Sequence, residues 1–290
     1  MNIKDAIVIL RPVNDIMGSL TVIIGILNTR IDVGIGKLII NIILGILTYF
    51  FIAGSGMIIN DIYDLEIDKI NRPERPIPSG RLALDEAKYL FIGTLAIGIS
   101  ISIIHSIIFS LNFLNVIIAA FFGFIGWIYA KWGKKSGFIG NIIVSISFSI
   151  GLIYGAILNS FDIPLYIYFF FFTCFFLLLS REVLKGCEDI EGDKEQGVKT
   201  LAIRIGVKKA TYISMVFAFI AIIFFILPIF TKILNPVLFL ISMILGIIVV
   251  LFSALSMLKA NLEKEDLSKI SLMLKIGAFL GLITFILASI

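Results

Sequence analysis

One run of the sequence gathers acidic side chains at helical spacing directly after a long apolar stretch. Asp61, Asp64 and Asp68 are separated by three and then four residues, so on a helix they project from one face, with Asn60 one turn before Asp64. Like charges on one face repel each other, and burial beside lipid strengthens the repulsion unless cations sit among them. Because oxygen-only ligands select a hard ion, the run predicts Mg2+ that completes its coordination with phosphate oxygens.

A second acidic run lies within residues 181–194, again at the end of an apolar stretch. Asp189 and Asp193 share a helical face. Two carboxylate faces brought together at one end of a bundle are suited to holding two or three magnesium ions around one diphosphate. Cations near both runs are predicted to neutralise the departing diphosphate. They are Arg72, Arg75, Arg181, Lys185 and Lys194.

The elements that must position these residues are membrane helices. The chain has 290 residues, is 59% hydrophobic and only 15% charged, and has a mean hydropathy of +1.09, which excludes an ordinary soluble domain. We therefore expect an all-α, polytopic membrane protein, with about nine transmembrane helices in one bundle, cytoplasmic Asp-rich connections and a single domain over residues 1–290. The apolar stretches are 13–29, 35–60, 87–109, 112–130, 138–158, 164–185, 209–230, 235–258 and 270–290.

The distribution of basic residues predicts the orientation. The N-terminus and residues 61–86, 131–137, 181–208 and 259–269 hold most of the Lys and Arg, whereas 109–112 and 159–163 hold none. Basic connections face the cytoplasm, so we expect a multi-pass cell-membrane protein with a cytoplasmic N-terminus and an active site facing the cytoplasm. The net charge of +4 then reports topology, and no nucleic-acid partner is expected. Polar residues interrupt the first apolar stretch, so no removable signal peptide is expected.

The two acidic runs follow the second and the sixth expected helix, about 125 residues apart, which suggests two related halves. Charge runs between membrane helices often only fix topology, but two runs with matching Asp spacing and flanking cations favour a site. Other chemically capable residues carry no such pattern. Cys174 and Cys187 lack metal-ligand spacing, His105 is expected to be packed or interfacial, and the Phe-rich run 169–176 is expected to be packing or lipid-facing.

Taken together, these motifs closely resemble the UbiA superfamily of intramembrane prenyltransferases. The matching segments are Asn60-Asp61-x-x-Asp64-x-x-x-Asp68, Asn71-Arg72-Pro73-Glu74-Arg75-Pro76-Ile77-Pro78-Ser79-Gly80, and Asp189-x-x-x-Asp193 with Gly197 and Thr200. Arg11-Pro12 also looks like the N-terminal signature of that family. The resemblance covers nearly the whole chain and implies an isoprenyl diphosphate donor.

Roles follow for individual residues. The expected Mg2+ ligands are Asn60, Asp61, Asp64, Asp68, Asp189 and Asp193. The residues expected to be catalytic are Asp64, Asp68, Asp189, Asp193 and, through the resemblance, Tyr129. The residues expected to bind substrate are Asn60, Arg72, Arg75, Lys131, Lys134, Arg181, Lys185 and Lys194.

Within the superfamily, residues 68–73 and 181–193 look most like the enzymes that form digeranylgeranylglyceryl phosphate in archaeal ether-lipid biosynthesis. This implies transfer from geranylgeranyl diphosphate to geranylgeranylglyceryl phosphate, a lipid-phosphate acceptor held among membrane lipids. Chlorophyll synthases and homogentisate or hydroxybenzoate prenyltransferases share much of the pattern, so an aromatic or chlorin acceptor is the alternative. Many aromatic-acceptor members place a lysine four residues after the tyrosine that ends the fourth span, but Gly133 stands there after Tyr129.

The implied reaction needs no histidine base. An apolar interior would keep water from the allylic cation, and the acceptor hydroxyl would lose its proton late, to a carboxylate or to the diphosphate. Lys131, Lys134 and Lys185 are candidates for the acceptor phosphate; with a neutral acceptor they would only set orientation. A secondary transporter is disfavoured because its coupling residues would lie near the midplane. An alcohol phosphotransferase is disfavoured because its compact aspartate pattern is missing from the sequence.

Overall fold

The computed structural model describes residues 2–195 and 197–290, without the side chains at positions 13, 14, 67, 70, 71, 134, 191, 192 and 195. The chain forms two compact units. Unit 1 consists of Met1–Ile26, Arg30–Lys134 and Tyr154–Phe161, and unit 2 consists of Leu27–Thr29, Lys135–Ile153 and Asp162–Ile290. Each unit therefore contains one of the two acidic runs, and each is described by itself.

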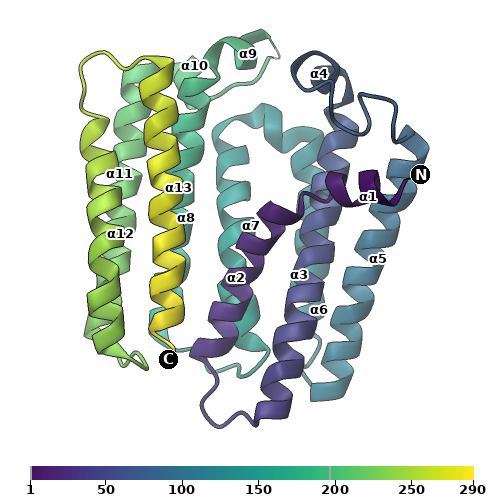
Figure 1. The fold of residues 1–290 in the computed structure, drawn as a ribbon, viewed down its shortest axis with the longest axis vertical. Coiled ribbons are helices and arrows are strands. Elements are labelled where there is room, and N and C mark those ends of the chain that lie inside the picture. Colours follow the sequence, from purple (N-terminus) through teal and green to yellow (C-terminus); the bar gives the residue numbers. More distant parts are fainter. Residues whose placement is uncertain (1, 196) are drawn as a thin grey trace. The chain divides into compact units, whose positions relative to one another are not determined.

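Unit 1 is built around one long helix, α3, which packs against both α5 and α6. The short helices α1 and α4 contact α3 and lie towards its C-terminal end (Figure 1). The π-helical segment η1 continues α6 and also packs against α3. The elements are α1 (Ile3–Ile9), α2 (Pro12–Asn28), α3 (Ile35–Tyr63), α4 (Leu65–Asn71), α5 (Leu84–Phe109), α6 (Leu114–Ile128) and η1 (Tyr129–Gly133).

Small residues allow the helices of unit 1 to approach closely. A Cβ on Gly126 of α6 would touch the Cα of Gly56 on α3, and a Cβ on Gly155 would collide with the Val22 carbonyl of α2. Close backbone approach through glycine is the usual packing device of membrane helices, because lipid supplies no hydrophobic driving force between them. The Gly126 contact lies in the C-terminal half of α3, which leads into the first acidic run.

Unit 2 is organised around α8, which packs against α11 and α13, while α12 packs against α11 and α13. Its core contains Phe170, which stacks on Phe285 with ring centroids 3.8 Å apart and on Phe239 at 6.1 Å. The Phe-rich run is therefore at least partly core packing, as predicted. The elements are η2 (Lys134–Ser136), α7 (Phe138–Ile157), α8 (Leu165–Glu188), α9 (Ile190–Glu195), α10 (Leu201–Ile205), α11 (Val207–Ile226), η3 (Leu227–Phe230), α12 (Pro236–Ser256) and α13 (Lys264–Leu287).

The predicted fold class is confirmed. Within the part of the chain that the structure describes, eight helices are long and apolar enough to cross a membrane, and they match eight of the nine predicted stretches. The remaining stretch, 13–29, forms α2, which has 17 residues. It spans about 25 Å, short of the roughly 30 Å hydrocarbon core. The expected count of about nine helices thus includes one short member.

A chain of buried polar side chains joins four segments of unit 1. His105 Nε2 lies 2.9 Å from Asn41 Oδ1, and the Asn41 amide donates to Asn159 Oδ1 at 2.7 Å. Asn159 in turn donates to the Ile26 carbonyl at 2.7 Å. His105 is therefore packed and hydrogen-bonded, as predicted. Because polar groups in an apolar bundle need partners, this chain fixes α2, α3 and α5 to the segment after α7.

Candidate active site

Both acidic runs stand where a long helix breaks into a short one. Asp64 ends α3 and precedes α4, with φ −86° and ψ 1°. Asp189 ends α8 and precedes α9, with φ −99° and ψ 17°. Both residues lie in the sparsely populated bridge region, which active-site residues often adopt. The sequence predicted helical spacing for the aspartates but did not predict these breaks.

The breaks preserve the predicted helical register. The Asp64 N–H donates to the Asn60 carbonyl at 2.9 Å, and the Asp68 N–H donates to the Asp64 carbonyl at 2.8 Å. In the second run the Asp193 N–H donates to the Asp189 carbonyl at 3.0 Å. Because these i to i+4 bonds continue across each break, the aspartates of a run stay one turn apart, as the spacing required.

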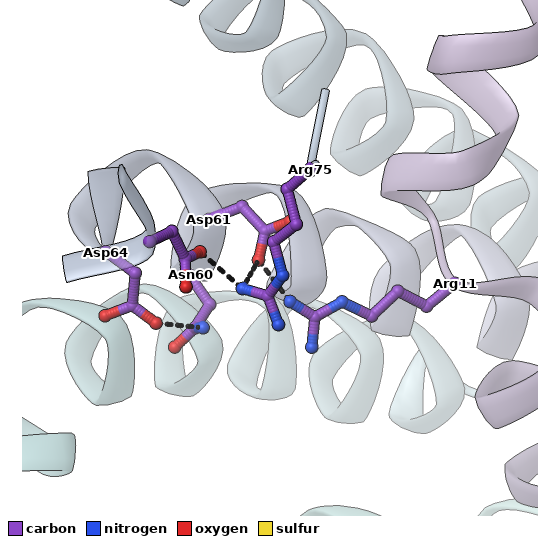
Figure 2. A network of polar contacts seen from close by, with 6 residues as sticks. Arg11, Asn60, Asp61, Asp64 and Arg75 are labelled. Carbon is purple, nitrogen blue, oxygen red and sulfur yellow. Dashed lines mark hydrogen bonds and ion pairs between the residues drawn. The ribbon is translucent and has the colours of Figure 1, made fainter. Parts of the chain in front are cut away.

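The first run is deeply buried although it is densely charged. Asp61, Asp64 and Asp68 are each at most 4% exposed. The Asn60 amide donates to Asp64 Oδ2 at 2.7 Å, which realises the predicted stacking of Asn60 on Asp64 (Figure 2). Buried carboxylates are costly unless paired or bound to a cation. The identity of their partners therefore decides what the site can do.

Two arginines supply positive charge to this run. Arg11 Nη2 pairs with Asp61 Oδ1, and Arg75 Nη1 lies 3.1 Å from the same oxygen. Arg75 Nη1 also pairs with Asp68 Oδ2. Figure 2 shows the two guanidinium groups meeting at Asp61. Arg75, expected from the sequence to contact diphosphate, thus contacts the aspartates, and Arg11 joins it.

The segments that carry the two arginines are anchored to unit 1 at other points. Arg81 Nε donates to Asp5 Oδ1 at 2.9 Å, which ties the segment after α4 to α1. Ile9, Leu10, Ile58, Ile77 and Leu82 form one apolar cluster, which joins the N-terminal segment, α3 and the segment after α4. The site is thus built from α3 and α4, covered by the N-terminal segment and by residues 72–82.

The oxygen donors of the first run suit a hard cation in their chemistry. Among the residues that the structure describes, no three His, Cys, Asp or Glu side chains lie close enough together to hold a metal ion. However, oxygens of Asp61 and Asp68 already converge on one cationic nitrogen, Arg75 Nη1. Two buried carboxylates that share one cation have the oxygen chemistry that Mg2+ requires. The guanidinium group therefore stands where a metal ion has suitable donors.

The second run is less enclosed within unit 2. Asp189 is exposed, Asp193 is half-buried and Lys194 is exposed. Arg181 Nη1 lies 3.0 Å from Glu182 Oε1, its neighbour in sequence, and its buried Nε has no hydrogen-bond partner among the described atoms. Lys185 lies in the last turn of α8, where its carbonyl accepts from the Asp189 N–H. Arg181 and Lys185 therefore lie one to two turns before Asp189.

The remaining predicted residues occupy the end of α6 and the start of the 72–82 segment. Tyr129 is half-buried and begins η1, and π-helical turns often mark functional sites. Lys131 Nζ lies 4.6 Å from the Trp132 ring centroid and 5.0 Å from that of Trp127. Its cation is therefore held over aromatic rings, an arrangement that stabilises an exposed ammonium group.

Arg72 is exposed and ends α4, where its N–H donates to the Asp68 carbonyl. Among the described contacts none joins the Arg72 side chain to the aspartates, which distinguishes it from Arg75. The side chain of Lys134 lies outside those that the structure describes. The two predicted arginines of this segment therefore have different surroundings: Arg75 is half-buried beside the carboxylates, whereas Arg72 is exposed.

Sequence reasoning noted Arg11 only as part of a family signature and gave it no place in the site. One signal was available: Arg11 lies directly before the first apolar stretch and is the sole basic residue between Lys4 and Arg30. A charge in such a place needs a buried partner or a function. The structure identifies that partner as Asp61.

Comparison with known proteins shows the family to which the chain belongs. The model of the UbiA prenyltransferase family matches residues 20–283. A digeranylgeranylglyceryl phosphate synthase from Thermococcus sibiricus is 37% identical over 292 residues, covering 100% of this chain and 99% of the relative. The enzyme of that name from Korarchaeum cryptofilum is 33% identical over 277 residues, covering 96% and 94%. The one from Sulfolobus acidocaldarius is 38% identical and covers 85% of each chain.

Solved structures agree in fold. A structure described as digeranylgeranylglyceryl phosphate synthase in membranes is 32% identical, covers 99% of this chain and 98% of its own, and has a TM-score of 0.81. A UbiA homolog from Archaeoglobus fulgidus bound to GPP and Mg2+ is 19% identical, covers 97% of this chain and 99% of its own, and has a TM-score of 0.70. At that identity the second likeness concerns the fold alone.

Proposed function

Because this chain belongs to the UbiA prenyltransferase family, we propose that it is a Mg2+-dependent enzyme of archaeal ether-lipid biosynthesis. It moves a geranylgeranyl group from geranylgeranyl diphosphate to geranylgeranylglyceryl phosphate. The observation that carries the proposal is the end-to-end likeness to relatives named digeranylgeranylglyceryl phosphate synthase. The buried aspartates of the first run supply the chemistry that such a reaction needs. Both units are assigned to one prenyltransferase domain over residues 1–290.

The aspartates are the proposed metal ligands. Asp61, Asp64 and Asp68 with Asn60 would hold Mg2+ in the first run, and Asp189 and Asp193 would do so in the second. When bound, Mg2+ supplies positive charge that stabilises the departing diphosphate. The convergence of Asp61 and Asp68 on one cationic nitrogen supports this assignment in the first run. Matching helix breaks at Asp64 and Asp189 support giving both runs the same role.

Other residues are assigned to binding and to exclusion of water. Arg72, Arg75, Arg181 and Lys194 would contact the diphosphate, and Lys185 would contact the phosphate of the acceptor together with Lys131 and Lys134. The half-buried Tyr129, held by η1 against α3, would line the path of the allylic group. The acceptor hydroxyl would lose its proton late, to a carboxylate or to the diphosphate oxygen that leaves.

An acceptor competition tests the function. Purified protein with Mg2+ and labelled geranylgeranyl diphosphate is offered geranylgeranylglyceryl phosphate, hydroxybenzoate or homogentisate in parallel, and the lipid products are separated. We expect label only in the product of geranylgeranylglyceryl phosphate. The matched control is Asp64→Asn, which keeps the shape of the side chain and should transfer no label. Label only on an aromatic acid would overturn the acceptor assignment and would leave the family membership intact.

The proposed orientation places both acidic runs at the cytoplasmic face and the N-terminus inside. Cysteines introduced for the exposed residues Glu74 and Lys199 should react with a membrane-impermeant maleimide in inverted vesicles and not in right-side-out vesicles. Cys187 is buried and Cys174 is half-buried, so background labelling is low. Labelling of either position from the outside would reverse the topology.

A further inference from the structure

The arginine pairs at the first aspartate run concentrate positive charge on a single oxygen. Arg11 Nη2 and Arg75 Nη1 both contact Asp61 Oδ1 (Figure 2). Arg75 Nη1 also pairs with Asp68 Oδ2. The pairs are largely removed from water, because the Asp61 side chain is 3% exposed and the Arg75 side chain 14%. Oppositely charged groups so placed attract each other more strongly than surface pairs do.

The charge of the two arginines can be compared with the charge of a metal ion. Two guanidinium groups bring two positive charges to the carboxylates, which equals the charge of one divalent metal ion. A metal ion and the arginines compete for the same Asp61 oxygen, so both cannot hold it fully at once. If the metal ion replaces the arginines, the positive charge that faces the carboxylates is unchanged. The two guanidinium groups are then available to bind another anion beside the site.

We propose that Arg11 and Arg75 are exchangeable counter-cations, which hold Asp61 and Asp68 in the metal-free protein and move to the diphosphate when Mg2+ and the isoprenyl diphosphate bind. The proposal rests on the proposed function, because the diphosphate is the donor of that reaction. Guanidinium groups are well suited to the second position, since their planar donors pair with phosphate oxygens as well as with carboxylates. Arg11 and Arg75 are thus positioning residues that act on the metal ligands.

The placement of the two arginines allows such an exchange. Neither residue belongs to the helices that carry the aspartates: Arg11 lies between α1 and α2, and Arg75 lies after α4. Arg11 also has φ +52°, a left-handed conformation that non-glycine residues rarely adopt. Such strain is typical of functional positions. Here the strained backbone directs the Arg11 side chain to Asp61.

The N-terminal segment and residues 72–82 have contacts with each other that do not depend on Arg11 and Arg75. Arg81 and Asp5 form a separate ion pair between the 72–82 segment and α1. The apolar cluster that contains Ile9, Leu10 and Ile77 joins the same two parts of the chain. The guanidinium groups can therefore change partners by side-chain rotation, while the backbone that carries them stays in place. Arg81 supplies a matched control, because it lies in the same segment as Arg75 and its described contacts are to Asp5 and the Glu74 carbonyl.

A binding experiment on the full chain in detergent tests the exchange. Mn2+ replaces Mg2+ so that bound metal is measured by electron paramagnetic resonance, first with the metal alone and then with inorganic pyrophosphate. For Arg11→Gln we expect about tenfold tighter binding of Mn2+ alone, a typical coupling between sites that share a group. The added affinity from pyrophosphate should be smaller than in the wild type. Arg11→Lys should restore wild-type behaviour in part, and Arg81→Gln should bind Mn2+ as the wild type does.

A second measurement uses the unaltered protein, so it does not depend on how the variants fold. Phenylglyoxal modifies accessible arginines, and the extent at Arg11, Arg75 and Arg81 is measured by mass spectrometry. Mn2+ alone should increase modification of Arg11 and Arg75, pyrophosphate together with Mn2+ should protect them, and Arg81 should not change. Unchanged modification of Arg11 and Arg75 under all conditions would overturn the exchange, as would equal Mn2+ affinity in Arg11→Gln and wild type.

The Mn2+ affinity of Asp64→Asn distinguishes a failure of the proposed metal site from a failure of the exchange. Asp64→Asn removes a proposed metal ligand that neither Arg11 nor Arg75 contacts in the described pairs. If Asp64→Asn binds Mn2+ as tightly as the wild type, the assignment of the metal site is wrong. If Asp64→Asn loses Mn2+ and Arg11→Gln does not gain it, the metal site stands and the exchange is wrong.

Discussion

The substitution Asp61→Asn tests how much the buried ion pairs of the site contribute to the stability of the fold. The substitution keeps the size of the side chain and removes the charge that Arg11 and Arg75 share. The two guanidinium groups then face a neutral amide. Breaking a fully buried ion pair costs about 3–5 kcal/mol because the remaining charge is left without a partner. The Arg11 side chain is 26% exposed and Arg75 keeps Asp68, so we expect a loss of roughly 2–4 kcal/mol.

Thermal unfolding in the presence of chelator measures this loss. Both tryptophans of the chain, Trp127 and Trp132, belong to unit 1, so their fluorescence reports the unit that contains Asp61. A loss of this size lowers the melting temperature by about 5–12 °C for a chain of this length. Chelator is required because a bound metal ion would replace the missing interactions and hide the effect.

Glu66→Gln is the matched control for Asp61→Asn. It is also a carboxylate-to-amide change at an ion pair, with Lys69 at 2.7 Å, but the Glu66 side chain is 79% exposed. Surface pairs contribute at most about 1 kcal/mol, so the melting temperature should fall by no more than about 3 °C. Equal melting temperatures for Asp61→Asn and wild type would refute the view that the arginine pairs hold the metal-free site together.

Three further predictions concern chemistry and packing. Chelation should abolish transfer and Mg2+ restore it, and Asp64→Asn and Asp193→Asn should each lower kcat at least about 100-fold, as for loss of one preorganised electrostatic contact; activity in chelator would exclude the metal mechanism. His105→Leu should lower the free energy of unfolding by about 1–3 kcal/mol, because the side-chain amide oxygen Oδ1 of Asn41 loses its buried partner; an unchanged melting temperature would show that the hydrogen bond contributes nothing. Gly155→Ala should abolish folding, since its methyl group would meet a backbone carbonyl of α2, whereas Gly36→Ala, in open space, should fold normally by size-exclusion chromatography.

The fold was largely predictable because each spanning helix needs a long apolar run, and such runs are visible in the sequence. α3 shows this directly, since no charged residue lies between Lys37 and Asp61. The short helices α4, α9 and α10 were not predicted, because helices of five to seven residues are set by tertiary contacts rather than by periodicity. The predicted stretch 13–29 already had the 17 residues of α2, so its length was predicted, and the error was to count it as a full membrane span.

In the candidate site, the positions of the aspartates could be predicted from the sequence, but the partners of the basic side chains could not. Helical spacing places Asp61, Asp64 and Asp68 on one face whatever the tertiary structure is. A long basic side chain can reach in several directions, so its partner depends on the fold. Arg75 therefore turned out to pair with carboxylates, and Lys131 to lie over Trp127, four residues earlier on the same helical face.

The two helix breaks argue that the acidic runs are kept for function and not for stability. Asp64 and Asp189 each end a long apolar helix, where the helix dipole presents partial negative charge and disfavours a carboxylate. Stability alone would favour glycine, asparagine or a basic residue at such a position. The chain places aspartate there twice, about 125 residues apart, and in unit 1 it adds Arg11 and Arg75 to neutralise neighbouring acids. Local rules are broken in this way chiefly at functional sites. A cation that binds during turnover explains the violation at both breaks, whereas topology explains only that the runs are charged.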